Sequence, residues 1–266
     1  MRKKLCAALL ALLVACPSFH AQNLLQETQE QKDKRMEWFH KAKLGIFIHW
    51  GIYAVKGVSE SWSFYNKYLP HDEYLKQCEG FTASKYDPKA WVDLIKESGA
   101  QYTVLTTKHH DGVALWDTKQ NGISVVKNTP AKRDLVTPFV NEVRKAGLRL
   151  GLYYSLPDWS HPDYPNMTRT DVRYKDDPKR WDNFCKFNFG QLKELNTTYK
   201  PDLYWFDGDW EQNAETWRAK GIMELLRSTN KDVIVNSRIT GYGDYATPEQ
   251  GVPVVRPEEK YWELCM

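Results

Sequence analysis

Asp207 lies in a run of aromatic residues that suits chemistry on a sugar ring. The run reads Trp205-Phe206-Asp207-Gly208-Asp209-Trp210 and ends a predicted strand. A carboxylate there can meet the positive charge that develops at an anomeric carbon, while aromatic rings stack on the apolar face of a sugar. Asp207 lies nearer the strand than Asp209 and is the candidate nucleophile. A simple turn is the alternative interpretation, because Asp-Gly is a common turn dipeptide.

Retaining glycoside hydrolysis needs a second carboxyl group about 5 to 5.5 Å from the nucleophile. Glu249 follows the fifth predicted strand, in a loop that could reach over the end of a sheet. Spacing alone does not select it, because a loop glutamate is commonly a solvated surface residue. The other downstream glutamates leave the choice open, and they are Glu258, Glu259 and Glu263.

The segment Lys108-His109-His110-Asp111-Gly112 follows the second predicted strand. Two imidazoles can donate hydrogen bonds to sugar hydroxyls or can bind a metal ion. Adjacent side chains of an extended segment point to opposite sides, so both rings should not bind one ion unless the loop is distorted. We therefore expect no metal here, and a structural pair of histidines is a further alternative.

Other predicted strands also end in polar or aromatic residues. His49 with Trp50 ends the first strand, Ser155 ends the third, and Arg238 follows the fifth. Each of these residues alone is commonly a core or rim residue. Because several strand ends supply hydrogen-bonding groups, we expect them to surround one common mouth.

Strand-like and helix-like segments alternate along the chain, which predicts an α/β fold with a parallel sheet. The strand-like runs are almost continuously apolar, as in strands that are covered on both faces, and they lie at residues 44–50, 102–107, 148–155, 202–206 and 232–236. Helical periodicity lies at residues 88–98, 135–146, 178–195 and 214–228. No glycine-rich phosphate loop follows the first strand, and the polar strand ends favour a (β/α)8 TIM-like barrel over a doubly wound sheet.

Composition indicates an ordered globular chain with one main domain. The 266 residues are 42% hydrophobic and 27% charged, and 14% are aromatic. The net charge of +3 matches the three basic residues Arg2, Lys3 and Lys4, so the rest of the chain is balanced. This balance argues against nucleic acid as a partner.

The N-terminal residues predict export. Residues 5–14 form an apolar run behind the three basic residues, too short to span a membrane. We expect a signal peptide over residues 1–21, or a lipoprotein leader that ends before Cys16, which would then carry a lipid anchor. The protein would be periplasmic, an outer-membrane lipoprotein or secreted, and residues 22–266 would form the barrel domain.

Five segments, in this order, resemble the α-L-fucosidases of glycoside hydrolase family 29. They are Gly45-Ile46-Phe47-Ile48-His49-Trp50-Gly51, Thr107-Lys108-His109-His110-Asp111-Gly112, Lys132-Arg133-Asp134-Leu135, Gly151-Leu152-Tyr153-Tyr154-Ser155 and Trp205-Phe206-Asp207-Gly208. The resemblance implies a distorted (β/α)8 barrel. It also implies a retaining exo-hydrolase that releases terminal α-L-fucose from glycans by double displacement, without a metal or other cofactor.

The resemblance also implies residue roles by motif position. Asp207 matches the nucleophile, and Glu249 matches the acid/base of one branch of the family, with Glu263 in reserve. The implied sugar contacts are His49, Trp62, His109, His110, Tyr153, Trp205 and Arg238. The family often has glutamate directly before the tryptophan, whereas Ser61 separates Glu60 from Trp62 here, so a contact by that acid is not carried over.

Family members usually continue through the last barrel strands into a β-sandwich, whereas this sequence ends at Met266. We therefore expect a barrel that is incomplete at its C-terminal end, without the β-sandwich. Two other functions stay open. One is a non-catalytic truncated barrel that binds fucose or glycans, and the other is a metal-dependent hydrolase that uses His109 and His110.

Overall fold

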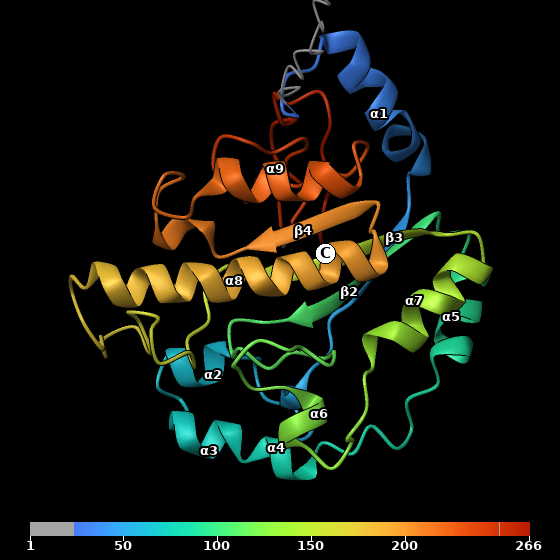
Figure 1. Ribbon diagram of the computed structural model, residues 1–266. Coiled ribbons are helices and arrows are strands. Elements are labelled where there is room, and N and C mark those ends of the chain that lie inside the picture. Colours follow the sequence, from blue (N-terminus) through green and yellow to red (C-terminus); the bar gives the residue numbers. More distant parts are fainter. Residues whose placement is uncertain (1–23, 250) are drawn as a thin grey trace, which may run out of the picture.

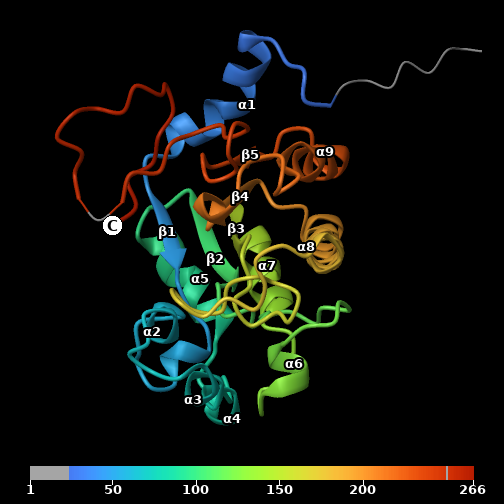
Figure 2. The ribbon, with the colours of Figure 1, turned by 90° about the vertical axis from the view of Figure 1, so that its left-hand side faces the viewer.

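A computed structural model describes residues 24–249 and 251–266, so the predicted leader and Cys16 lie outside the described residues. Its five strands are all parallel and form one sheet in the order β1-β2-β3-β4-β5. Figure 1 shows β2, β3 and β4 of this sheet behind the long helix α8 (Pro178–Tyr199), and Figure 2 labels all five strands. A doubly wound sheet reverses its strand order part-way, whereas a barrel keeps it consecutive, so the order favours the barrel. The strands are β1 (Gly45–Ile48), β2 (Tyr102–Lys108), β3 (Arg149–Ser155), β4 (Leu203–Asp207) and β5 (Ile234–Val235).

The four helices predicted from periodicity are present, and they are α5 (Pro88–Glu97), α7 (Val136–Lys145), α8 (Pro178–Tyr199) and α9 (Ala219–Thr229). The starts of α5 and α8 are encoded locally: Asp87 and Asp177 cap them, and a proline follows each cap. Helix α9 begins at Ala219 rather than at residue 214. The preceding residues form turns that end at Arg218, whose φ of 56° is left-handed.

Helix α1 (Gln29–Ala42) was not predicted, although Thr28 and Gln31 form a capping box at its start. The other unpredicted helices are too short to show a periodicity. They are η1 (Ile52–Ala54), α2 (Trp62–Tyr65), α3 (His71–Leu75), α4 (Gln77–Gly80), α6 (Val125–Asn128) and η2 (Asp209–Glu211). All of these short helices lie in connections that follow the C-terminal ends of strands.

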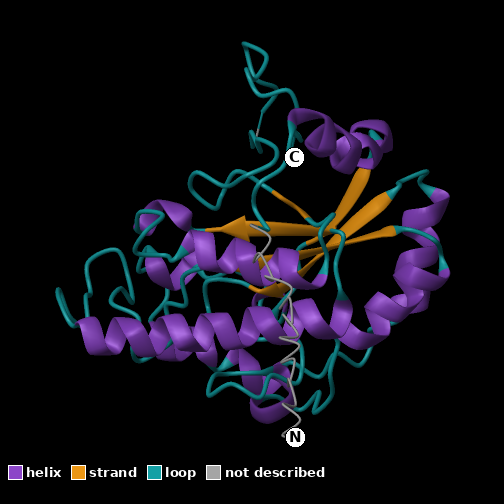
Figure 3. Cartoon of the chain, turned by 45° about the horizontal axis from the view of Figure 1, so that its top comes forward, coloured by secondary structure: helices purple, strands orange, loops and turns teal. Residues whose placement is uncertain are grey.

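The sheet has a buried layer on each face. Leu105 and Leu152 pack outward, in the cluster between the sheet and the helices, while Val104, Tyr153 and Trp205 pack inward in a second cluster. Helices α7, α8 and α9 lie on the outer side of the sheet (Figure 2), and the loops extend away from the strands (Figure 3). Alternate residues of each strand therefore face an outer layer and an interior, as in a barrel.

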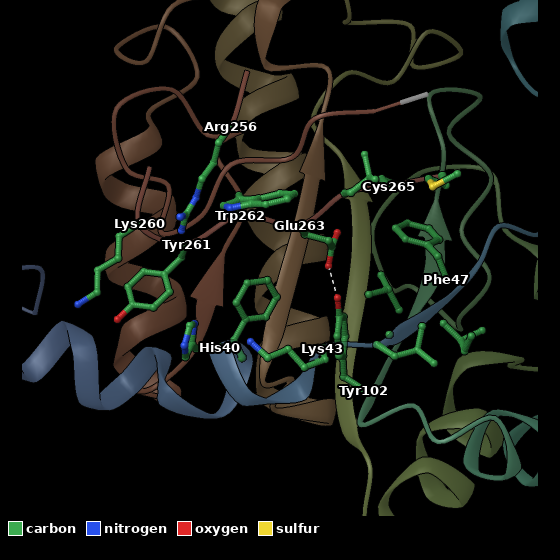
Figure 4. Close-up of a pocket in the computed structure, with 17 residues that line it drawn as sticks. His40, Lys43, Phe47, Tyr102, Arg256, Lys260, Tyr261, Trp262, Glu263 and Cys265 are labelled. Atoms are coloured by element: carbon green, nitrogen blue, oxygen red, sulfur yellow. Dashed lines mark hydrogen bonds between the residues drawn. The ribbon is translucent and has the colours of Figure 1, made fainter. Parts of the chain in front are cut away.

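Beyond β5 the chain continues the same parallel order through isolated bridges, which pair Asn236 with Tyr245 and Ala246 with Trp262. The last residues then share a cavity of about 690 Å³ with β1, as Figure 4 shows. Within the described residues, β1 has a strand ladder with β2 and with no other strand. The sheet thus curls toward closure, and this cavity separates its two edges.

No helix within residues 24–249 and 251–266 combines the length and the hydrophobicity that crossing a membrane requires.

Candidate active site

Asp207 is the last residue of β4 and lies opposite Ser155 at the end of β3. Its carboxylate accepts a hydrogen bond from the hydroxyl of Tyr153 at 2.8 Å and one from Nη1 of Arg238 at 2.6 Å. The chain turns immediately at Gly208, where φ is 82° and a Cβ atom would lie 2.3 Å from Cδ of Pro157. Asp207 therefore ends a strand and begins a tight turn. The sequence allowed a simple turn as an alternative to a functional role, and the structure has both, because the turn directs the carboxylate toward Tyr153 and Arg238.

Arg238 links Asp207 to Glu249. Its Nη1 contacts Asp207 at 2.6 Å, and its Nη2 lies 2.7 Å from Oε2 of Glu249. Because both nitrogens belong to one planar guanidinium, the two contacted carboxylate oxygens lie within about 8 Å of each other. That limit accommodates the spacing of about 5 to 5.5 Å in retaining glycosidases. The structure thus brings together two carboxyl groups that are far apart in the sequence.

Glu263 lies in a different place. Its carboxylate accepts hydrogen bonds from the hydroxyl of Tyr102, the first residue of β2, and from Nε1 of Trp205 at 2.9 Å. Figure 4 shows it pointing to Tyr102 across the cavity beside β1. Burial raises the pKa of Glu263 above its usual value. Glu263 is therefore held in the interior at the start of β2, while Glu249 contacts the arginine that binds Asp207.

The structure contradicts the expectation that His109 and His110 point to opposite sides. The pairing of β2 with β3 shifts register between Thr106 and Lys108, which is a β-bulge, and the strand ends there. The two imidazole rings then lie 4.3 Å apart, centroid to centroid. Nε2 of His110 lies 3.5 Å from Oδ2 of Asp207. Beyond Lys108 the chain enters a turn, in which the N–H of Gly112 donates to the carbonyl oxygen of His109 at 3.0 Å, so adjacent side chains no longer alternate and both histidines face the same side as the carboxylate.

The protonation of His110 follows from its neighbours. The hydroxyl of Ser155 donates to the carbonyl oxygen of Pro157 at 2.6 Å, so its only proton is used. Nδ1 of His110, 2.7 Å from that hydroxyl oxygen, must therefore donate to it. Burial lowers the pKa of His110 to about 4, so the ring is neutral at pH 7. Nε2 thus carries a lone pair, and it has no hydrogen-bond partner among the described residues.

The other two histidines are also held through Nδ1. His109 shares a hydrogen bond with the hydroxyl of Ser61, and His49 shares one with the hydroxyl of Tyr53 at 2.7 Å. Burial is the main cause that lowers the pKa of both imidazoles. Three neutral rings therefore lie around one carboxylate, and each can donate or accept a hydrogen bond without adding charge.

Trp205 and Trp62 occupy different depths. The ring of Trp205 is 2% exposed, and the guanidinium carbon of Arg238 lies 4.6 Å from its centroid. Trp62, at the start of α2, is only partly buried and lies 5.5 Å from the ring of His110. Trp205 thus supports Arg238 from the interior through a cation–π contact, while Trp62 lies nearer the opening.

The ligand atoms of His109, His110 and Asp207 lie within 4.8 Å of one another. Spacing alone would allow zinc, whose nitrogen and oxygen ligands at about 2.0 to 2.2 Å lie up to about 4.4 Å apart, since Nε2 of His110 and Oδ2 of Asp207 are 3.5 Å apart. The carboxylate of Asp207 is already held by Tyr153 and Arg238, and the guanidinium would repel a second cation. The arrangement fits a polar organic ligand better than a metal ion.

Comparison with known proteins gives the family. The sequence model described as alpha-L-fucosidase matches residues 12–266. The chain belongs to the alpha-L-fucosidase family. It is 32% identical over 253 residues to tissue alpha-L-fucosidase of Bos taurus, covering 86% of this chain and 52% of that protein. It is also 32% identical to an alpha-L-fucosidase of Branchiostoma floridae, covering 97% of this chain and 61% of that protein.

Solved alpha-L-fucosidase structures share the fold. The isoenzyme 1 from Paenibacillus thiaminolyticus is 34% identical with a TM-score of 0.82, covering 88% of this chain and 61% of that one. A family 29 enzyme from Bacteroides thetaiotaomicron is 33% identical with a TM-score of 0.76, covering 88% of this chain and 59% of that one. These similarities confirm the barrel fold class. The chain spans about half to three fifths of the length of these relatives.

Alpha-L-fucosidases often have a glutamate directly before the tryptophan that corresponds to Trp62, and the sequence alone did not show what the residue at that position contacts here. Ser61 stands there, fully buried, and shares a hydrogen bond with His109. Glu60 lies one position earlier with a left-handed φ of 35°, and its charge acts on His49 by raising the pKa that burial lowers. A serine thus makes the contact to the histidine, and the acid lies near a different one.

Three residues at this site were not among those predicted from the sequence: Tyr53, Ser61 and Trp210. Ser61 gives no local signal, because it contacts His109 from a segment that only the fold brings near, and Tyr53 lies four residues after His49 without a motif that marks it. Trp210 did have a signal, since it ends the aromatic run that begins at Trp205. The sequence placed Trp210 in the aromatic run, and the structure shows that its side chain is exposed to solvent.

Proposed function

We propose that this chain carries the catalytic site of a retaining exo-α-L-fucosidase that acts on fucosylated glycans. The observation that supports this most is Arg238, which contacts Asp207 and Glu249 with two nitrogens of one guanidinium. Family membership supplies the substrate class. The unpartnered Nε2 of His110 provides an acceptor for a substrate hydroxyl beside the nucleophile.

In the first step, an oxygen of Asp207 attacks the anomeric carbon of fucose as the glycosidic bond breaks. The departing oxygen takes the proton of the Glu249 carboxyl group, and a fucosyl ester of Asp207 forms. In the second step, Glu249 takes a proton from water, whose oxygen attacks the same carbon. The ester bond to Asp207 then breaks, and fucose leaves with its configuration retained.

Glu249 must change partners during this cycle. In the free chain its carboxylate is paired with Arg238, while proton donation requires the neutral acid. Its side chain is 37% exposed at the end of a loop, whereas that of Asp207 is 11% exposed. We infer that a bound substrate separates Glu249 from Arg238 and that Asp207 keeps its contact.

Hydrolysis of an aryl α-L-fucoside tests the proposal with Asp207→Ala, Glu249→Ala and, as a matched control, Glu259→Ala, which alters an exposed glutamate of the last segment. We expect the first variant to lose several orders of magnitude in kcat, the second to lose less on an activated leaving group, and the control to be unchanged. Added azide should give the β-fucosyl azide with the Asp207 variant and the α-fucosyl azide with the Glu249 variant.

The same assay separates the alternatives. Turnover that survives a chelator supports the fucosidase, and turnover that a chelator abolishes supports a metal-dependent hydrolase. Fucose binding without any turnover supports a non-catalytic binding protein. Unchanged activity in the Asp207 variant would remove the assignment of the nucleophile.

We also propose export of the protein, because the basic residues before an apolar run at residues 5–14 are typical of a signal peptide. Cys16 is the proposed lipid attachment site if the leader is that of a lipoprotein. Labelling with a radioactive fatty acid, with Cys16→Ser as the control, distinguishes a lipoprotein from a protein that is cleaved and released.

A further inference from the structure

Trp210 is an exposed tryptophan on a turn that is held firmly on both sides. Its ring is 55% exposed, and it is the middle residue of η2, three residues after Asp207. Most large aromatic residues of the chain lie in one of the two cores, where burial stabilises them. An aromatic ring left in water on a rigid turn gains little from folding, so its position needs another explanation.

Both neighbours of Trp210 are fixed by hydrogen bonds. The carboxylate of Glu211 accepts from Trp159 at 2.8 Å, from Tyr164 at 2.5 Å and from Asn166 at 2.8 Å. On the other side, the carboxylate of Asp209 accepts from Thr240 at 2.8 Å and its carbonyl accepts from Trp217 at 2.9 Å. The turn therefore holds the backbone of Trp210 in place while its side chain points away from the core.

The ring lies at the rim of the candidate active site. Its centroid is 6.1 Å from that of His110 and 6.4 Å from that of Trp62, with the two indole planes 15° apart. The guanidinium carbon of Arg238 lies 6.0 Å from the same ring. Because His110 and Arg238 both contact or flank Asp207, Trp210 lies beside the nucleophile but further toward solvent.

We propose that the exposed face of Trp210 binds the sugar ring to which the fucose is attached. This inference rests on the proposed fucosidase function and assigns the site a second subsite, for a pyranose that leaves with the glycosidic oxygen. A pyranose presents a face of C–H groups that stacks on an indole, and the indole loses its contact with water in doing so. The neighbouring Arg238 and Trp62 would bound that sugar on its inner side.

Two substrates distinguish sugar binding by Trp210 from the hydrolysis reaction at Asp207. α-L-Fucosyl fluoride has no sugar on its leaving side and reports only fucose binding and reaction. A fucosyl disaccharide, chosen as the linkage that the unchanged chain hydrolyses fastest, also reports the second subsite. We expect Trp210→Ala to lower kcat/KM for the disaccharide about tenfold or more and to leave the fluoride within about twofold.

Two further variants complete the experiment. Trp210→Phe keeps an aromatic face and should restore most of the disaccharide activity. Tyr68→Ala removes an aromatic side chain that is 80% exposed, lies outside the site and should affect neither substrate. An equal loss on both substrates, or no loss on either, would overturn the assignment of Trp210.

If the unchanged chain does not hydrolyse the fluoride, the proposed function fails, and the subsite is tested by binding. The indole N–H resonance of Trp210, identified by its absence in Trp210→Phe, is followed during titration with fucosyl disaccharides of each linkage in turn. A resonance that shifts with saturation supports the subsite, and one that does not move refutes it.

Discussion

Ser155 fixes the proton of His110 by giving its own proton to the carbonyl oxygen of Pro157. The hydroxyl can then only accept from Nδ1, which leaves Nε2 unprotonated and 3.5 Å from Oδ2 of Asp207. The opposite tautomer would aim an N–H at Asp207, the proposed nucleophile, and weaken it. Ser155 is thus a positioning residue: from the end of β3 it sets the tautomer of His110, which follows the neighbouring strand β2.

Ser155→Ala should release this constraint. We expect His110 to take up the Nε2–H tautomer, because that proton can then be donated to Asp207, and kcat/KM for an aryl fucoside should fall about tenfold to a hundredfold. Nitrogen-15 shifts of the imidazole report the tautomer directly, independently of turnover. Ser155→Thr keeps the hydroxyl and should retain the Nδ1–H form; the same tautomer in all three proteins would contradict the assignment.

Acid should destabilise the fold through its buried histidines. The pKa of His110 is about 4 in the folded chain against an ordinary value of 6.5, so between these pH values the unfolded chain binds more protons. The contribution of His110 to the free energy of unfolding should therefore fall as the pH drops from about 6.5 to about 4, by on the order of 3 kcal/mol, while Asp111, whose pKa burial raises to about 6, contributes in the opposite direction. His49 and His109 are shifted in the same direction as His110 and should add to its effect.

Urea unfolding at pH 7, 5.5 and 4.5 measures the slope of the free energy of unfolding against pH. His110→Gln should make it shallower, whereas His40→Gln, which changes an exposed histidine on α1, should leave it as it is. A slope that is identical in all three proteins would show that His110 does not contribute.

Arg238→Lys should separate the two carboxyl groups. A lysine ammonium is a single point charge, so it cannot hold Asp207 and Glu249 as the two guanidinium nitrogens do. We expect kcat to fall about a hundredfold with a small change in the melting temperature. Arg218→Lys, at an exposed pair with Asp182, is the matched control and should keep full activity.

Arg35→Ala should destabilise the chain without touching the site. Arg35 on α1 binds both carboxylate oxygens of Asp244, at 2.7 and 2.8 Å, and so attaches α1 to the segment after β5. Asp244 would remain buried with the backbone N–H of Val235 at 3.0 Å and with only long ion pairs, to Arg227 at 3.5 Å and Lys32 at 3.9 Å, so the loss of unfolding free energy should be about 2 to 4 kcal/mol. Lys41→Ala, which removes an exposed pair with Glu37, should cost less than about 0.5 kcal/mol. Thermal or urea unfolding compares the two variants, and equal losses would refute the argument.

The elements of the fold could be predicted because their signals are local. Apolar runs long enough for strands and helical periodicity long enough for three turns are properties of neighbouring residues, and Asp87 and Asp177 begin their helices by capping them directly. Short helices such as α2 and η2 carry too few residues for a period, and they lay in the connections that shape the site. Asp207 was found because its aromatic neighbours are adjacent to it in sequence.

By itself the sequence determined the order of strands and helices, the nucleophile candidate and the family that its motifs resemble. Only the tertiary structure decided that His109 and His110 face one side, that Glu249 rather than Glu263 shares an arginine with Asp207, and that Trp210 is exposed at the rim. Each of these depends on register, on the turn that follows β2 and on which loop meets which strand end. Such contacts join residues far apart in the chain, and no local pattern of residue types encodes a distance between them.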